Sequence, residues 1–155
     1  MKTGVALSDG IAGKYVAIAI LAAAVERAGG PLPAHRRLIN ISLADSARAA
    51  LVNVAQNVLV SGVDARSWGN AHPNLVPYQL FDAVDRPFVV AVGSDGQWRA
   101  AARALGLGHL GEDETLRRTA GRLKPRERVV NAMPRRVIAA NAPNWLDALG
   151  AAGVP

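Results

Sequence analysis

The sequence predicts a mixed α/β protein built from two parts. Residues 8–62 follow a helix–strand–helix order, which is typical of a layered α/β domain. Residues 78–92 hold two short strand patterns close enough for a hairpin, and helical patterns follow them. The chain has 155 residues, which fit one ordinary domain or pieces of two. Half of the residues are apolar, so a disordered chain is excluded.

The first part opens with a long apolar segment. Ser8-Asp9-Gly10 precedes it and Gly29 follows it, so an N-cap at Ser8 or Asp9 and a stop at Gly29 predict a helix of about five turns. This helix is apolar nearly all round, and burial on most of its faces is expected. No partner sheet is visible in the chain, so exposed apolar surface is expected if these residues fold alone.

A short strand and a second helix are expected next. Leu38–Leu43 alternates in polarity and predicts a strand. Apolar residues at helical spacing predict a helix from about Asp45, as its cap, to Val60, with Gly62 as the stop. Residues 63–77 contain Gly, two Pro and two Asn without periodicity, and they predict a linker or an ordered functional loop.

The second part starts with the predicted hairpin strands Tyr78–Phe81 and Pro87–Val92. The Ser-x-x-Gln pattern of residues 94–97 is typical of a capping box and opens a helix that runs to Leu105. Residues 126–140 are helical in pattern, with a break or kink expected at Pro134, and a last short helix is expected through Leu149.

Charge and composition exclude several classes of function. The net charge is +6, and residues 117–128 hold six basic residues against one acid, which favours a solvated helical face over a phosphate-binding patch. No aromatic residue lies in this run, so a stacking platform for single-stranded nucleic acid is excluded and no nucleic-acid partner is expected. Cysteine is absent, and His35 and His109 have no second ligand at a suitable spacing, so no metal site is expected.

Other classes are excluded by length or by missing motifs. The apolar run Tyr15–Val25 is shorter than the roughly 20 residues that cross a bilayer, so a soluble, cytoplasmic protein without a membrane partner is expected. Neither a Gly-x-Gly-x-x-Gly motif nor a P-loop motif is present, so neither motif supports a dinucleotide-dependent or nucleotide-triphosphate-dependent enzyme.

The segment Trp68–Phe81, WGNAHPNLVPYQLF, closely resembles a signature of class III (CaiB/BaiF-type) CoA-transferases, Gly-Asn-x-His-Pro-Asn-Ile-x-Pro-Tyr-Gln-x-Phe. Ser8–Gly13 resembles the catalytic-aspartate turn of that family, and Ile39–Asp45 resembles its Val-Ser-Leu-x-Asp segment. Val92–Trp98 and Trp145–Pro155 are similar to signatures of its small domain. The resemblance covers nearly all of this chain but only the middle of a family member.

The resemblance implies a fragment of a Rossmann-like large domain followed by an α+β small domain, truncated at both ends. Residues 1–62 would belong to the large CoA-binding and catalytic domain, 63–77 would form a linker or active-site loop, and 78–155 would form the small domain. Family members are interlocked dimers, so a homodimer or a complementing chain is expected.

The implied chemistry transfers CoA between an acyl-CoA and a carboxylic acid, with Asp9 as the nucleophile and no permanently bound cofactor. Asp9 would form a mixed anhydride and then an aspartyl-CoA thioester. The helix dipole would favour its ionised form, and the N–H groups of Gly10 and Ile11 would face the oxyanion. Six residues are expected to bind the substrate or CoA: Gly10, Gly69, Asn70, His72, Asn74 and Gln79.

Simpler interpretations of these residues stay open. From its position alone, Asp9 is expected as a helix cap, and the resemblance to the family reverses that preference. A rigid turn in which His72 caps a carbonyl group is as strongly expected for His72-Pro73 as a substrate role. Tyr78 and Phe81 are expected in the core of the small domain. A glycine-rich loop of the oxalate and formate branch is replaced here by residues 71–74, which points to other acyl groups such as dicarboxylates.

Two alternative functions remain. One is 2-methylacyl-CoA racemase chemistry on the same fold, in which the aspartate acts as a base; that branch needs a histidine upstream of the aspartate. The other is no catalysis at all, in an inactive remnant or a small basic binding domain.

Overall fold

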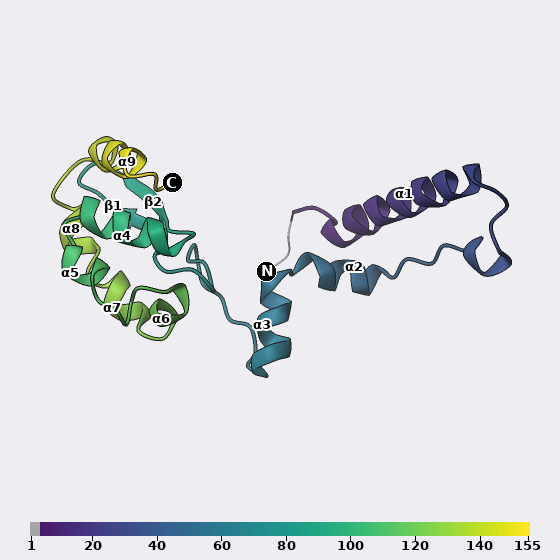
Figure 1. Cartoon of the computed structure of the whole chain (residues 1–155), viewed down its shortest axis with the longest axis horizontal. Coiled ribbons are helices and arrows are strands. Elements are labelled where there is room, and N and C mark those ends of the chain that lie inside the picture. The colour runs from purple at the N-terminus through teal and green to yellow at the C-terminus, as the bar shows by residue number, and fades with distance from the viewer. Residues whose placement is uncertain (1–3) are drawn as a thin grey trace. The chain divides into compact units, whose positions relative to one another are not determined.

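The computed structural model describes residues 4–155, which divide into two compact units joined at Arg66 and Ser67 (Figure 1). Each unit is described by itself. Unit 1 holds α1 (Leu7–Ala28), a 3₁₀ helix (Ala34–Arg36), α2 (Leu43–Ala50) and α3 (Asn53–Ser61). Unit 2 holds β1 (Tyr78–Asp82), β2 (Pro87–Ala91), α4 (Asp95–Ala104), α5 (Gly108–Gly111), α6 (Thr119–Leu123), α7 (Arg126–Val130), α8 (Pro134–Val137) and α9 (Ala142–Ala151).

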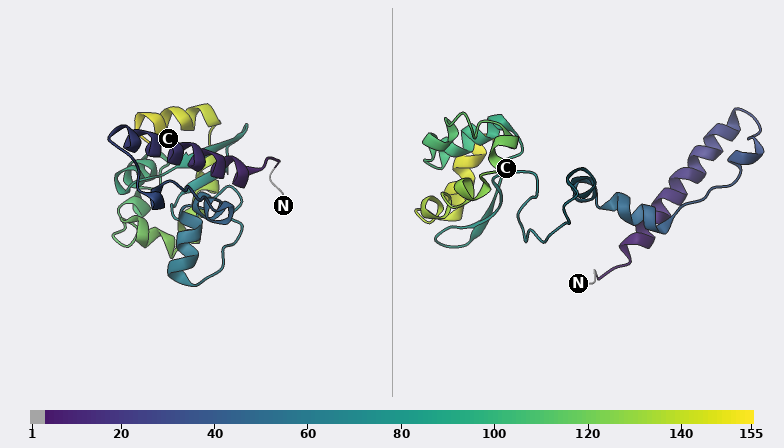
Figure 2. Two further views of the ribbon diagram at one scale, coloured as in Figure 1. Left: turned by 90° about the vertical axis from the view of Figure 1, so that its right-hand side faces the viewer. Right: turned by 90° about the horizontal axis from the view of Figure 1, so that it is seen from below.

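Helix α1 has 22 residues. It is uninterrupted, as both views of Figure 2 show. Gly29 ends it as predicted, but the helix starts at Leu7 with Ala6 as its N-cap. The expected cap at Ser8 or Asp9 is therefore wrong. Both residues lie inside the first turn, where their own backbone is already helical, and no side chain caps the helix.

The apolar surface of α1 is exposed. Within unit 1 the helix packs against α2, and none of its residues is buried. Leu21 is 66% exposed and Val25 is 77% exposed. Burial on most faces of this helix is therefore not found in the described residues, and the exposed apolar surface expected for a chain without a partner sheet is confirmed.

By length and composition, α1 could also cross a membrane. The expectation that the apolar run is too short rested on residues 15–25 alone, and the helix that contains them is twice as long. One such helix is weak evidence for a membrane span, because the core helix of a soluble protein has the same length and composition.

The predicted strand at residues 38–43 is not formed. A strand needs a neighbour for its backbone hydrogen bonds, and the two strands described, β1 and β2, pair with each other. The chain instead runs extended to Ser42, whose hydroxyl accepts the Asp45 N–H at 3.1 Å and caps α2. Asp45 is thus the third residue of α2 and does not cap it. Val52, at φ 43°, interrupts the predicted long helix and separates α2 from α3.

The predicted hairpin of unit 2 is confirmed. Strands β1 and β2 are antiparallel and pair from Tyr78 opposite Ala91 to Asp82 opposite Pro87. One face of the hairpin turns Phe81, Phe88 and Val90 into the core. Helix α8 contacts β1, and α9 contacts both β2 and α4, so these helices cover the core. Its other buried apolar residues include Trp98, Leu105, Leu116, Val129, Met133, Val137 and Leu149.

The capping signals of unit 2 are mostly confirmed. The Ser94 hydroxyl accepts the Gln97 N–H at 3.2 Å at the start of α4. The reciprocal bond is displaced by one residue, since the Gln97 side chain accepts from the N–H of Gly93. The helical pattern of residues 126–140 is split into α7 and α8, and α8 begins at Pro134, as expected.

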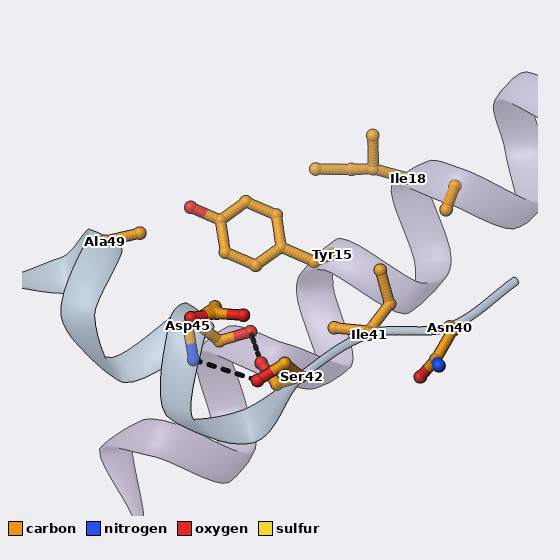
Figure 3. A pocket seen from close by; sticks show the side chains of 9 residues that line it. Tyr15, Ile18, Asn40, Ile41, Ser42, Asp45 and Ala49 are labelled. Atoms are coloured by element: carbon orange, nitrogen blue, oxygen red, sulfur yellow. Dashed lines mark hydrogen bonds between the residues drawn. The ribbon is translucent and has the colours of Figure 1, made fainter.

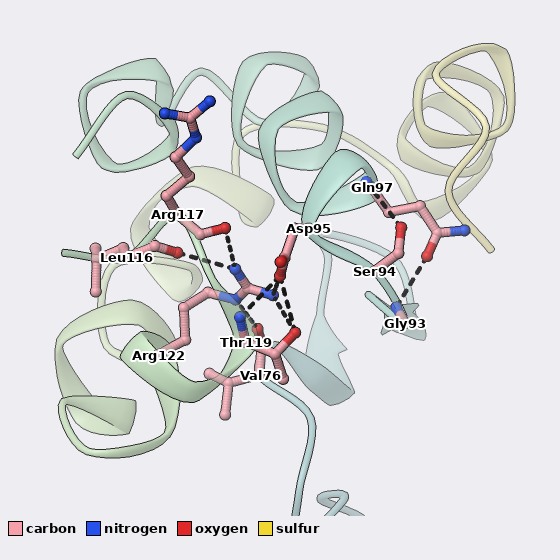
Figure 4. Close-up of polar contacts among 9 residues, drawn as sticks. All are labelled: Val76, Gly93, Ser94, Asp95, Gln97, Leu116, Arg117, Thr119 and Arg122. Carbon is pink, nitrogen blue, oxygen red and sulfur yellow. Dashed lines mark hydrogen bonds and ion pairs between the residues drawn. The ribbon is translucent and has the colours of Figure 1, made fainter. Parts of the chain in front are cut away.

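The basic run of residues 117–128 is exposed in part, as expected, at Arg117, Arg118, Lys124 and Arg128. Arg122 departs from the expectation, because it is buried with 1% of its side chain exposed and is held by the polar contacts drawn in Figure 4. Its guanidinium donates to the carbonyl oxygens of Val76 at 2.8 Å and Leu116 at 2.9 Å, and to Asp95 at 3.2 Å. Burial lowers the pKa of Arg122, and the Asp95 carboxylate opposes that shift. The expectation is wrong for Arg122 because its partners are mainly backbone carbonyl groups, which carry no sequence signal.

Candidate active site

Asp9 is exposed on the first turn of α1 and has no capping role. It is the acidic residue of that turn and the third residue of the helix. The first N–H groups of a helix lack partners within it, and they give this end a partial positive charge that favours a carboxylate. The structure therefore presents an accessible carboxylate on the first turn of a helix that it does not cap.

The neighbouring Gly10 is engaged within the helix. Its N–H donates to the carbonyl oxygen of Ala6 at 3.0 Å. Because the helix starts before Asp9, this N–H is not free for an oxyanion as the sequence predicted. A Cβ added at Gly10 would meet no atom within 4 Å, so the glycine leaves open space beside Asp9.

A groove of about 550 Å³ lies beside this turn, between α1 and α2. Its charged residue is Arg48, whose guanidinium lies 3.0 Å from the Asp45 carboxylate on the exposed face of α2. The groove is otherwise mainly apolar and is lined by Leu7, Ser8, Ile11, Ala47, Ala50 and Leu51.

A second groove, of about 700 Å³, lies farther along the same pair of helices (Figure 3). Tyr15 and Ile18 of α1 face Asp45 and Ala49 of α2 across it. Ser42 lies at the floor of this groove, and both of its oxygen atoms accept hydrogen bonds. Its hydroxyl accepts the Asp45 N–H and caps α2, and its carbonyl oxygen accepts the Ser46 hydroxyl at 2.8 Å. Ser42 and Ser46 therefore stabilise the start of α2.

Unit 2 brings the other predicted site residues together in the loop of residues 68–74 and at the start of β1. Asn70 accepts the N–H of Leu80 at 3.0 Å through its side-chain oxygen. The N–H of His72 donates to the carbonyl oxygen of Tyr78 at 2.9 Å, and the two rings stack with their centroids 5.2 Å apart. These contacts fold the 68–74 loop back onto β1.

The ring of His72 accepts a local hydrogen bond, whereas it was expected to donate one. Its Nδ1 accepts the N–H of Asn74 at 3.0 Å, whereas the sequence analysis expected the ring to cap a carbonyl group. An accepting Nδ1 places the proton of the neutral ring on Nε2. Phe81 is buried as expected, whereas Tyr78 is half-buried against His72.

The remaining predicted residues occupy defined positions. Gly69 has φ +59°, a left-handed conformation that favours glycine. Gln79 pairs with Val90 across the hairpin and is half-buried. Asp9 and Gly10 belong to unit 1, whereas Gly69, Asn70, His72, Asn74 and Gln79 belong to unit 2. Within residues 4–155 no group of three His, Cys, Asp or Glu side chains is arranged to hold a metal ion.

Sequence analysis missed Arg126, the first residue of α7. One of its terminal nitrogens donates to the carbonyl oxygens of His72 at 3.0 Å and Pro73 at 2.8 Å. Its guanidinium carbon lies 4.6 Å from the ring centroid of Trp68. The arginine was visible only as a member of the basic run, because its partners lie more than 50 residues away in the sequence.

Known proteins resemble this chain over its whole length. The model of CoA-transferase family III matches residues 1–155. Over 114 residues, 74% of the chain, the sequence is 39% identical to a succinate–glutarate CoA-transferase of Agrobacterium fabrum, of which it covers 28%. It is 30% identical over 157 residues to a succinyl-CoA:glutarate CoA-transferase of Mus musculus, and this alignment covers 100% of the chain and 35% of the mouse protein.

A solved structure supports the same relation. The chain matches the crystal structure of a CaiB/BaiF family protein from Brucella suis with a TM-score of 0.60 and 34% identity. The match covers 100% of this chain and 40% of that protein. The chain therefore spans between about a quarter and two fifths of the length of these three proteins.

Proposed function

The chain belongs to CoA-transferase family III, and on that basis we propose that it forms the central part of an enzyme that moves CoA between an acyl-CoA and a carboxylic acid. The observation that carries this proposal is the exposed carboxylate of Asp9 on the first turn of α1, where it has no capping role. Coenzyme A enters as a thioester substrate rather than as a resident cofactor.

In the proposed reaction, an oxygen of the Asp9 carboxylate attacks the thioester carbonyl carbon and the C–S bond breaks, which releases CoA as a thiolate. The thiolate then attacks Cγ of Asp9 in the mixed anhydride, and the acyl group leaves as a free carboxylate. The acceptor carboxylate attacks the resulting aspartyl-CoA thioester and expels the thiolate again. Attack of the thiolate on the acceptor acyl carbon gives the new acyl-CoA and restores Asp9.

We propose that the 68–74 loop and Gln79 contribute to the substrate site, and that the acids are dicarboxylates. The resemblance to the family motif supports the loop assignment, and the succinate and glutarate in the names of two relatives support the acid class. Gly69, Asn70, His72 and Asn74 belong to the 68–74 loop and Gln79 to β1, and the bonds from Asn70 to Leu80 and from His72 to Tyr78 hold the loop against that strand.

Unit 1 is proposed to be part of the large, Rossmann-like CoA-binding domain, and residues 78–155 the small domain. The described residues of unit 1 include no buried apolar side chain, whereas relatives devote more than half of their length to regions that this chain does not cover. We propose that a homodimer or a complementing chain covers α1 and completes the site.

The test is to trap CoA on Asp9. The chain, alone and together with a polypeptide that carries the remaining family regions, is incubated with succinyl-CoA and its intact mass is measured. A CoA adduct that hydroxylamine removes is expected, and Asp9→Asn should abolish it. Asp45→Asn is the matched control, because Asp45 is also an exposed carboxylate at the third position of a helix.

An adduct that persists in Asp9→Asn would overturn the assignment of the nucleophile. Deuterium exchange at the α-carbon of a 2-methylacyl-CoA, without any acceptor acid, would indicate the racemase alternative instead.

A further inference from the structure

We propose that Arg126 is a positioning residue that holds the 68–74 loop in its substrate-binding conformation. This inference rests on the proposed function, because that proposal assigns the loop to the substrate site. It adds a residue from α7 that no motif of the sequence marks and that need not touch the substrate itself.

The contacts of Arg126 hold the loop at both ends. Its terminal nitrogen donates to the carbonyl oxygens of His72 and Pro73, at 3.0 and 2.8 Å. Hydrogen bonds from a charged donor are about twice as strong as neutral ones. The guanidinium also lies over the ring of Trp68, at 4.6 Å from its centroid, which adds a cation–π contact at the start of the loop.

The loop depends on such contacts because residues 68–74 form no helix or strand of their own. The bonds from Asn70 to Leu80 and from His72 to Tyr78 tie it to β1. Two successive carbonyl groups that converge on one nitrogen fix the orientation of the peptide between His72 and Pro73. The directions of the His72 ring and of Asn74 follow from that peptide, since Asn74 is bonded to His72 Nδ1.

Arg126 is suited to this role by its place in the fold. It is half-buried and begins α7, which adjoins α6 and the buried Arg122. Arg122 holds the carbonyl oxygen of Val76 at 2.8 Å, just beyond the loop. The two arginines of the basic run thus hold the chain on both sides of Asn74, one within the core and one at the loop.

The experiment compares the full chain with Arg126→Ala, Arg126→Lys and the control Arg128→Ala. Arg128 lies in the same helix and pairs with Asp113 at the surface, so its loss removes the same charge without touching the loop. Amide hydrogen exchange is measured in residues 68–80 and in α4. Because bonds with a charged donor are lost, Arg126→Ala should accelerate exchange at His72 and Asn74 by about tenfold to a hundredfold.

Exchange in α4 should stay unchanged in Arg126→Ala, and Arg128→Ala should match the parent chain. Arg126→Lys should be intermediate, because an ammonium group can donate to the carbonyl groups but lacks the planar face that stacks on Trp68. Unchanged exchange in the loop, or acceleration of the loop and α4 together, would overturn the inference.

Kinetics separate positioning from a merely structural role. With succinyl-CoA and glutarate, in the complemented protein, Arg126→Ala should raise KM about tenfold and leave kcat nearly unchanged, because uniform binding is lost. A faster-exchanging loop with an unchanged KM would contradict the positioning role. If the parent protein forms no CoA adduct and shows no turnover, the proposed function fails, while the exchange measurement still decides whether Arg126 holds the loop.

Discussion

Replacing the buried Arg122 with methionine should destabilise unit 2 severely. Methionine fills part of the space of the aliphatic stem but removes every hydrogen bond of the guanidinium. The carbonyl oxygens of Val76 and Leu116 would lose their donor, and both residues are fully buried. Asp95 would lose its ion-pair partner but keep the bonds from the N–H and hydroxyl of Thr119, and water can reach it because its side chain is 49% exposed.

The size of the loss follows from these groups. A buried acceptor left without a donor costs about 1–3 kcal/mol, so two of them cost about 2–6 kcal/mol. Removal of one partner of a buried ionic network costs about 3–5 kcal/mol, which is the same range. We therefore expect Arg122→Met to lower the free energy of unfolding of unit 2 by about 4 kcal/mol. A unit of ~90 residues has a total stability of roughly 4–13 kcal/mol, so this loss amounts to between about one third and all of that stability.

The assay is urea unfolding followed by tryptophan fluorescence. Trp68, Trp98 and Trp145 are the three tryptophans of the chain and all belong to unit 2, so the signal reports on this unit. Arg117→Met is the matched control, since Arg117 pairs with Glu114 at the surface and is half exposed. Its loss should cost less than about 1 kcal/mol. If Arg122→Met were as mild as this control, the argument from buried carbonyl groups would be refuted.

Three further predictions concern other parts of the chain. Hydrogen bonds from the hydroxyl and N–H of Thr115, and then from Arg128, lower the pKa of Asp113 from its ordinary 3.8 to about 2. Its contribution to stability is therefore complete above about pH 4 and is lost as the pH falls toward 2, and Asp113→Asn should flatten the dependence of the urea midpoint on pH in that window. In Gly121→Ala the new Cβ would overlap the carbonyl oxygen of Thr115, so the free energy of unfolding should fall by about 1–3 kcal/mol in the same assay. Gly150→Ala is the control, because a Cβ there meets open space, and it should be neutral or slightly stabilising. In the chain alone, the transition followed by far-ultraviolet circular dichroism should be broader than the fluorescence transition, because unit 1 lacks a core; coincident curves would contradict this.

Local signals were sufficient for the elements that form locally. The stop at Gly29, the cap at Ser94 and the break at Pro134 each depend on one residue and its near neighbours, and the structure confirms all three. The prediction of a strand at residues 38–43 was wrong because a strand depends on a neighbouring strand for its hydrogen bonds, and the described residues of unit 1 offer none. The break at Val52 was missed because its positive φ conflicts with the preference of a β-branched residue.

The candidate site, too, could be predicted from the sequence only in part. The motif around residues 68–81 identified the loop and the family, because a motif consists of residue types at fixed positions and needs no structure to be recognised. The bonding inside the loop was not predictable, because Asn70 and His72 bind backbone groups of β1 that carry no sequence signal. Arg122 and Arg126 were counted as surface charge for the same reason, since their partners are mainly carbonyl groups 5 to 54 residues away.

The described apolar core lies in unit 2, and this constrains how activity can arise. Unit 2 has its own core around Trp98 and holds the 68–74 loop in place. Unit 1 carries Asp9, yet the apolar residues of α1 are exposed, and most of the stability of a helix in a protein comes from the packing of its apolar face. The proposed nucleophile therefore lies on a helix whose apolar surface needs a partner, whereas the 68–74 loop belongs to a unit with its own core. Binding at the loop can then survive in the chain alone, but adduct formation at Asp9 should require whatever covers α1.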